Sequence, residues 1–209
     1  MPTATTTISH ITKQHLVPVL VERGFTVSGT TYRRSAGTAT QVVTLQRGSK
    51  NSVVAASFHL NGGVYLPELD AVIGAPAVEQ PDEPSCHVRI RPNDVIESGR
   101  DQYLVGPETD AESFGKAAAG DLAALIDALD RFVTPADAVA HLSTRLLAQY
   151  ERVFGWQLHQ GDLADARLFV GALRSRFGEE RRWAIFVERL DVVSQHVRGD
   201  LAWREWIER

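Results

Sequence analysis

The hydrophobic positions of the chain first recur with the spacing of a helix. From Ile8 to Arg23 they lie three, four or five residues apart, and the five-residue gap at His15 interrupts an otherwise helical stripe. Pro18 costs this helix a backbone hydrogen bond, so we expect a kink or a fresh start there. Gly24 is well placed to end the helix in the left-handed conformation.

After this helix the spacing changes to two, which is typical of β-strands. The alternating positions are Phe25 and Val27, Val43 and Leu45, then Val54, Ala56, Phe58 and Leu60, then Val88 and Ile90, with a last short strand at Gln102 to Val105. The links RSAGT and QRGSKNS are predicted to be polar hairpin turns. The sequence Asn61-Gly62-Gly63 fits a turn or a bulge in a continuing strand, and we favour the bulge.

From residue 110 onward the pattern is helical again. Leu122, Leu125, Ile126 and Leu129 form one stripe, and Thr134-Pro135 with Asp137 is a typical helix start. The stretch from Tyr150 to Leu173 is either a single tetratricopeptide-like hairpin or, as we favour, a generic helix pair.

These patterns predict an α+β fold. We expect an antiparallel sheet of four to five strands with helices on one face, over residues 1–133, and a helical C-terminal extension packed on it, over residues 134–209. The common parity of six strand residues predicts that they share the face buried against the helices; they are Val43, Leu45, Phe58, Leu60, Val88 and Ile90.

Composition narrows the class of protein. The chain has 209 residues, of which 44% are hydrophobic and 23% charged, as in an ordinary globular protein. Its net charge of -4 gives no reason to expect a nucleic acid or an acidic membrane as partner. A single cysteine, Cys86, excludes an intramolecular disulfide and fits a reducing, cytoplasmic location. We find neither a secretory signal nor an apolar run of the ~18 residues that a membrane span needs.

The search for catalytic and cofactor signatures is negative. The chain lacks the glycine-rich phosphate loops, the nucleophile elbow and the paired-histidine zinc motif, so we predict no catalytic residue, cofactor or metal site. Cys86 and His87 are adjacent in a predicted strand and should point to opposite faces, which excludes a local metal pair. Cys86 is expected to be a small core residue.

Two surfaces remain as candidates for binding. The basic turn QRGSK, with Arg47 and backbone amides around Gly48, fits either an anion site or a solvated turn, and we favour the turn. The second is the polar sheet face opposite the helices. The candidate binding surface comprises Gln46, Arg47, His59, His87, Arg89 and Arg91.

Several segments together resemble a bacterial family, domain of unknown function 4304. They are LVERGF, TYRR, TQVVTLQRGS, SFHLNGGVYLP, CHVRIRPNDVI and GRDQYLV, and the resemblance covers roughly residues 8 to 133. In two places the chain departs from the family pattern: Gly48 is inserted before Ser49, and Gln102-Tyr103 stands where relatives often carry tryptophan. The resemblance implies a compact α+β domain and transfers no activity or site residue.

Two functional hypotheses follow. The favoured one is a non-enzymatic cytoplasmic module of the immunity or adaptor type that binds another protein. The alternative is an enzyme, or a protein that binds a small ligand or anion, with a polar pocket between the sheet and the C-terminal helices.

Overall fold

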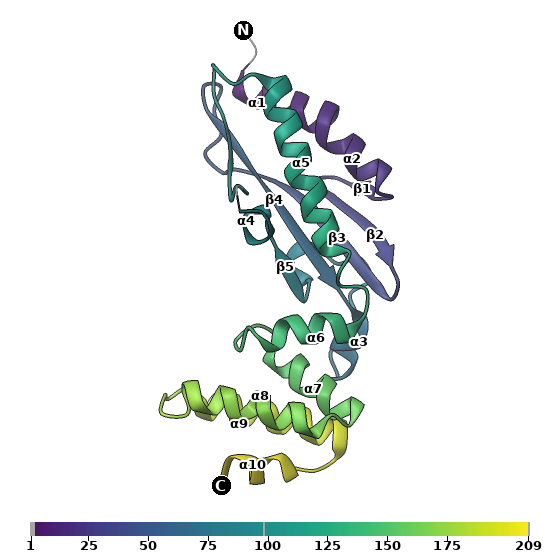
Figure 1. Cartoon of the computed structure of the whole chain (residues 1–209), viewed down its shortest axis with the longest axis vertical. Helices are drawn as coiled ribbons and strands as arrows, with labels where there is room; N and C mark the ends of the chain where they lie inside the picture. The colour runs from purple at the N-terminus through teal and green to yellow at the C-terminus, as the bar shows by residue number, and fades with distance from the viewer. Residues whose placement is uncertain (1–2, 98, 209) are drawn as a thin grey trace. The chain divides into compact units, whose positions relative to one another are not determined.

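The computed structural model describes residues 3–97 and 99–208. The chain forms two compact units (Figure 1). The sheet unit comprises Met1–Tyr65 and Gln80–Val133, and the helical unit comprises Leu66–Glu79 and Thr134–Arg209. The helical unit therefore combines the segment from Leu66 to Glu79 with the region from Thr134 onward.

The N-terminal helix is interrupted by a turn of π-helix. It consists of α1 (Ala4–Ile11), the π-helix η1 (Thr12–Leu16) and α2 (Val17–Glu22). The amide of Val17 bonds to the carbonyl of Thr12, and this wider turn keeps both Ile11 and Leu16 buried across their five-residue gap. The fresh start at Pro18 and the left-handed Gly24 (φ +79°) are both confirmed.

The sheet is antiparallel throughout. Its strands are β1 (Thr26–Ser28), β2 (Thr31–Ala36), β3 (Ala39–Arg47), β4 (Ala56–Tyr65), β5 (Val88–Ile90) and β6 (Tyr103–Val105). The order is β1-β2-β3-β4-β5, and β6 also pairs with β4. The fold class is confirmed, with six strands in the described part of the chain. The additional strand, β2, follows the turn after β1 and gives only a weak hydrophobic signal, because Tyr32 is its one fully buried hydrophobic side chain.

One face of the sheet packs against helices. Figure 1 shows α5 (Ala111–Leu129), α1 and α2 alongside the strands. All six residues predicted for the inner face are buried. The cross-strand pairs Leu45↔Leu60 and Gly62↔Ile90 place β3, β4 and β5 in the expected register. Burying each large side chain here contributes about 1.5–3 kcal/mol.

The prediction of a bulge at Asn61-Gly62-Gly63 is wrong. The pairing of β3 with β4 runs without interruption from Thr40↔Tyr65 to Arg47↔Phe58. The two glycines serve packing instead. A Cβ on Gly62 would lie 3.0 Å from Leu125 of α5, and a Cβ on Gly63 would lie 2.7 Å from both Cβ and Sγ of Cys86 on the opposite face.

Short segments complete the sheet unit. The loop after residue 79 contains the 3-10 helix η2 (Glu83–Ser85), and α4 (Pro92–Val95) lies in the connection between β5 and β6.

The helical unit contains the remaining elements. They are α3 (Pro67–Ala71), α6 (Pro135–Ser143), α7 (Tyr150–Gln160), α8 (Leu163–Phe177), α9 (Trp183–Arg198), η3 (Ala202–Arg204) and α10 (Glu205–Glu208). The predicted start of α6 is confirmed, since Thr134 and Asp137 form a reciprocal capping box. The side chain of Arg152 on α7 holds α3 through two hydrogen bonds to Asp70 Oδ1, of 2.9 and 2.6 Å.

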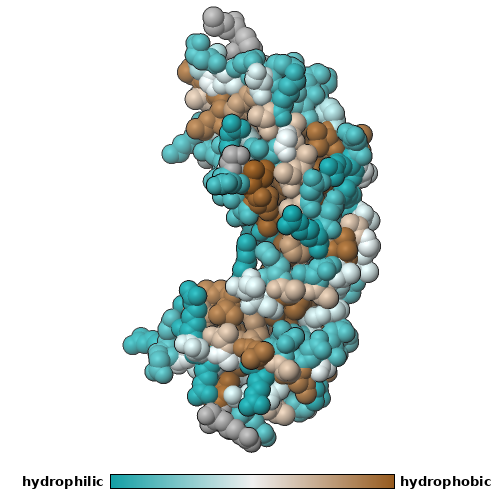
Figure 2. Space-filling view, viewed as in Figure 1, coloured by the Kyte–Doolittle hydropathy of each residue, from teal (hydrophilic) through white to brown (hydrophobic). Residues whose placement is uncertain are grey.

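Neither unit offers a membrane-spanning element: no helix in the described residues is both long and apolar enough to cross a bilayer. On the side seen in Figure 2, exposed hydrophobic side chains form small groups among hydrophilic ones.

Candidate functional site

The face of the sheet opposite α5 carries a set of polar side chains that strand alternation brings together. Gln46 pairs with His59 across β3 and β4, and Gly63 pairs with Arg89 across β4 and β5. These residues therefore point away from the buried face that contains Leu45 and Leu60. We call the polar patch the set Gln46, His59, Asn61, Arg89, Arg91 and Asp101.

A chain of hydrogen bonds runs through the polar patch. Asn61 Nδ2 donates to Gln46 Oε1 (2.8 Å), and Arg91 Nε donates to Asn61 Oδ1 (2.9 Å). Arg91 Nη1 also donates to Asp101 Oδ1 (2.6 Å). The backbone carbonyl of Asp101 accepts a hydrogen bond from His59 Nδ1 (2.8 Å). Because Asn61 is buried and both ends of its amide are bonded, it fixes the exposed groups around it.

Arg89 lies beside this series of hydrogen bonds and forms a separate ion pair with Glu83. Its Nε donates to Glu83 Oε1 at 2.6 Å. This hydrogen bond to Glu83 is the main reason that the pKa of Arg89 is raised above its ordinary value. Glu83 is buried whereas Arg89 is exposed, so the arginine neutralises a carboxylate that has little access to water.

The patch opens into a shallow polar hollow of about 270 Å³. Its lining residues are Glu83, Arg89, Ile90, Arg91, Asn93, Asp94 and Asp101. Three carboxylates thus stand against two guanidinium groups. The hollow has mixed charge, and it is not a basic site suited to phosphate.

His87 does not belong to this accessible surface, contrary to the prediction. It is buried, and its ring stacks on Tyr65 with centroids 5.0 Å apart. The segment from Gln80 to Cys86 covers this end of the polar face: the carbonyl of Pro81 accepts a hydrogen bond from Arg33 Nε (2.7 Å). Tertiary packing of a loop, which alternation does not report, therefore removes His87 from the surface.

The expected opposite orientation of Cys86 and His87 is also wrong. Strand β5 begins at Val88, so its alternation does not extend back to Cys86. Cys86 packs on Gly63, and His87 stacks on Tyr65, which lies on the same face as Gly63. Burial raises the pKa of the Cys86 thiol to about 12, with a further contribution from Glu83. The thiol therefore stays protonated at neutral pH and packs as a small core group.

Arg47 lies on the other side of the sheet from the patch. It pairs with Phe58 on the helix side, and its Nη2 donates to Ser9 Oγ of α1 (2.9 Å). In the QRGSK turn the amide of Gly48 donates to the carbonyl of Ser57 (2.8 Å). That amide is therefore already bonded within the turn, an arrangement that fits the turn interpretation of this segment rather than an anion site.

Sequence reasoning missed two members of the polar patch, Asn61 and Asp101, and the carboxylate of Glu83 beside it. Asn61 has the same parity as His59 along β4, so the alternation contained this signal, but the bulge prediction obscured it. Asp101 and Glu83 come from loops, and their positions depend on how the segments around β5 fold back. No local pattern identifies them.

Comparisons with known proteins give one family. The family model described as Domain of unknown function (DUF4304) matches residues 16–127. No curated protein and no solved structure matches the chain.

Proposed function

Since this chain belongs to the DUF4304 family, whose function is unknown, we propose a function from its own geometry: a non-enzymatic cytoplasmic module that binds another protein through the polar patch. The observation that carries the proposal is the hydrogen-bonded chain from Gln46 through Asn61 and Arg91 to Asp101. It holds exposed polar groups in place on a sheet face that α5 leaves open. Side chains ordered before binding lose less entropy when a partner docks.

The charges of the patch favour a protein over other partners. Each arginine already has a carboxylate partner within the patch or beside it, at 2.6 Å in both cases. A nucleic acid needs a surplus of positive charge, which this surface lacks. A surface that alternates in sign instead suits the polar rim of a protein interface, where arginine is enriched.

The dimensions of the hollow point the same way. At about 270 Å³ and with a mostly polar lining, it is smaller and more polar than usual small-molecule sites of ~300–1,000 Å³. The chain has one cysteine, and its thiol is buried and protonated. Both facts are compatible with the reducing cytoplasm.

A charge reversal at Asp101 tests the proposal with little risk to folding. Replacing both arginines by alanine would leave the buried Glu83 carboxylate and Asn61 Oδ1 without their arginine donors, so it is a poor probe. Asp101→Lys instead removes an exposed ion pair with Arg91, in which the side chains are 54% and 42% exposed. Such pairs contribute at most about 1 kcal/mol.

The chain offers a matched control. Asp127 on α5 pairs with Arg23 at 2.8 Å, with side chains 59% and 37% exposed. Asp127→Lys therefore makes the same change in net charge, at an equally exposed ion pair, on the helix side of the sheet unit.

The experiment is affinity capture from a lysate of the source organism, quantified by mass spectrometry, with the three tagged proteins at equal concentration. We expect a protein that is retained by the wild type and by Asp127→Lys, and whose recovery falls at least tenfold with Asp101→Lys. Equal recovery with all three, or equal loss with both variants, would contradict the proposal. Circular dichroism melting confirms that both variants are folded.

A further inference from the structure

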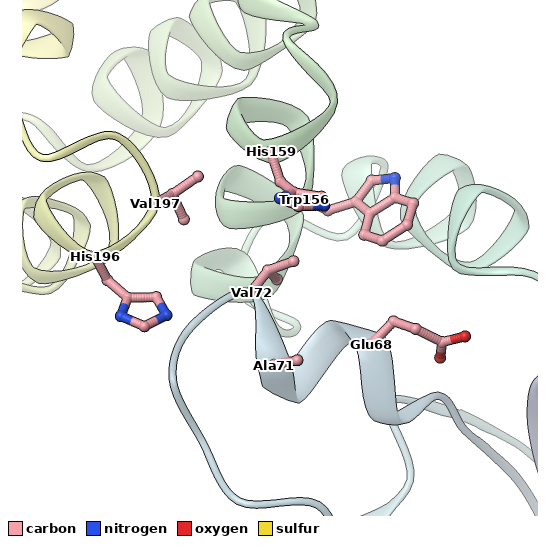
Figure 3. Close-up of a pocket in the computed structure, with 7 residues that line it drawn as sticks. All are labelled: Glu68, Ala71, Val72, Trp156, His159, His196 and Val197. Atoms are coloured by element: carbon pink, nitrogen blue, oxygen red, sulfur yellow. The ribbon is translucent and has the colours of Figure 1, made fainter.

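The helical unit contains a cavity that is independent of the polar patch. It measures about 470 Å³, within the usual range of small-molecule sites. Helices α3, α7 and α9 form its walls, and Figure 3 shows the lining residues. They are Glu68, Ala71, Val72, Trp156, His159, His196 and Val197.

Close contacts between backbone and side chains hold these walls in place. A Cβ on Gly155 of α7 would lie 3.1 Å from Val193 and 3.3 Å from Ile73, so a larger residue at this position would press on both side chains. Gly74, with φ +71°, packs against the ring of His196. A Cβ on Gly74 would lie 3.1 Å from His196 Cε1. With α3 also held by the Asp70–Arg152 pair, the cavity is formed before any ligand arrives.

The lining combines an apolar surface with one carboxylate, from Glu68, and two imidazoles, from His159 and His196. Ala71, Val72 and Val197 supply aliphatic surface, and Trp156 supplies an indole. No lysine or arginine is among the lining residues. In Figure 3 the indole of Trp156 and the carboxylate of Glu68 lie on one side of Val72, and the imidazole of His196 lies on the other.

Glu68 is incompletely satisfied. Its Oε2 is shielded from solvent and has no hydrogen-bond partner among the residues that the structure describes. A carboxylate that has lost part of its hydration without a compensating donor is costly. A cation that pairs with the Glu68 carboxylate, which lines the cavity, would offset that cost, and the indole of Trp156 in the same lining attracts cations as well.

We propose that this cavity binds a small aliphatic amine in its ammonium form. The ammonium group pairs with Glu68, and the methylene chain packs on Val72, Val197 and the indole of Trp156. An anion would be repelled by Glu68, and a neutral chain of the same length would leave the carboxylate uncompensated.

Three ligands of equal length test the charge requirement on the unaltered protein. Isothermal titration calorimetry at pH 7 compares hexylamine, which is protonated at this pH, with 1-hexanol and hexanoate. We expect hexylamine to bind at least tenfold more tightly than 1-hexanol, and hexanoate to bind most weakly. Comparable affinity for the amine and the alcohol, or no binding of the amine, would overturn the proposal.

Substitutions locate the binding in the cavity. Glu68→Gln keeps the shape of the side chain and removes its charge, and should weaken hexylamine binding about tenfold or more, the scale of a charged hydrogen bond. Trp156→Leu should weaken it about two- to thirtyfold. Glu188→Gln, at an exposed position of α9 outside the lining, is the control and should bind as the wild type does. Unchanged affinity in Glu68→Gln would also overturn the proposal.

Discussion

The substitution Gly63→Ala probes how tightly the segment from Gln80 to Cys86 is packed on the sheet. A methyl group at this position would stand 2.7 Å from both Cβ and Sγ of Cys86, closer than carbon and sulfur atoms can approach. Cys86 is fully buried in a cluster with Val42 and Tyr65, so it has little room to move away. The backbone of the loop or the strand must shift instead.

The expected loss follows from overpacking. Extra methyl groups in a filled core cost about 1–3 kcal/mol, and the entropy gained by replacing glycine offsets at most about 1 kcal/mol of this. We therefore expect Gly63→Ala to lower the free energy of unfolding by about 1–2 kcal/mol. Gly120→Ala is the contrasting control. Gly120 lies on the exposed side of α5 with no atom within 4 Å of the added Cβ, so this change should stabilise the protein by up to about 1 kcal/mol.

The assay must report on the sheet unit. All four tryptophans, at positions 156, 183, 203 and 206, belong to the helical unit, so their fluorescence follows that unit. Urea unfolding monitored by circular dichroism follows both units. The penalty of Gly63→Ala should shrink but persist in a Cys86→Ala background, because the Sγ contact is removed and the Cβ contact remains. If Gly63→Ala is as stable as the wild type, the argument from close packing is refuted.

Two further predictions concern ionisable groups. Asp191 accepts hydrogen bonds from Arg204 Nε (2.9 Å) and Trp203 Nε1 (3.1 Å), and the bond from Arg204 is the main reason that the pKa of Asp191 lies below its ordinary value of 3.8. Because the folded pKa is depressed, the stability that Asp191 contributes is fully present above about pH 4 and is lost as the pH falls through the folded pKa. The difference in unfolding free energy between the wild type and Asp191→Asn, from urea titrations followed by tryptophan fluorescence, should therefore shrink with acidification; a constant difference would contradict this. Cys86, buried and with its pKa raised to about 12, should resist alkylation by iodoacetamide at pH 8 in the native protein and react once urea unfolds it. Mass spectrometry measures both rates, and rapid modification of the native protein would show that the thiol is accessible.

The periodicity of the sequence determined the N-terminal helix, the helical region after residue 110, the parity of most strands and the buried face. Each of these depends on a side chain and its near neighbours along the chain, so local spacing is enough. The same holds for Gly24, whose left-handed backbone ends α2, and for the capping box at Thr134. Even the five-residue gap at His15 was a signal, since it marks the π-helix that keeps Ile11 and Leu16 on one side.

Some errors in the candidate site came from signals that the sequence did contain. Arg47 has the parity of Leu45, and alternation alone places it on the helix side. Asn61 has the parity of His59, and an unbroken strand would have placed it in the patch.

Other features were decided only by tertiary structure. Several features depend on how the loops fold back onto the strands and helices. They are the burial of His87, the ion pairs Arg91–Asp101 and Arg89–Glu83, and the membership of residues 66–79 in the helical unit. The cavity beside Glu68 joins residues 68 and 197, which no local pattern relates. Contacts of this kind are set by the packing of whole elements, because the energy that fixes them comes from surfaces far apart in the chain.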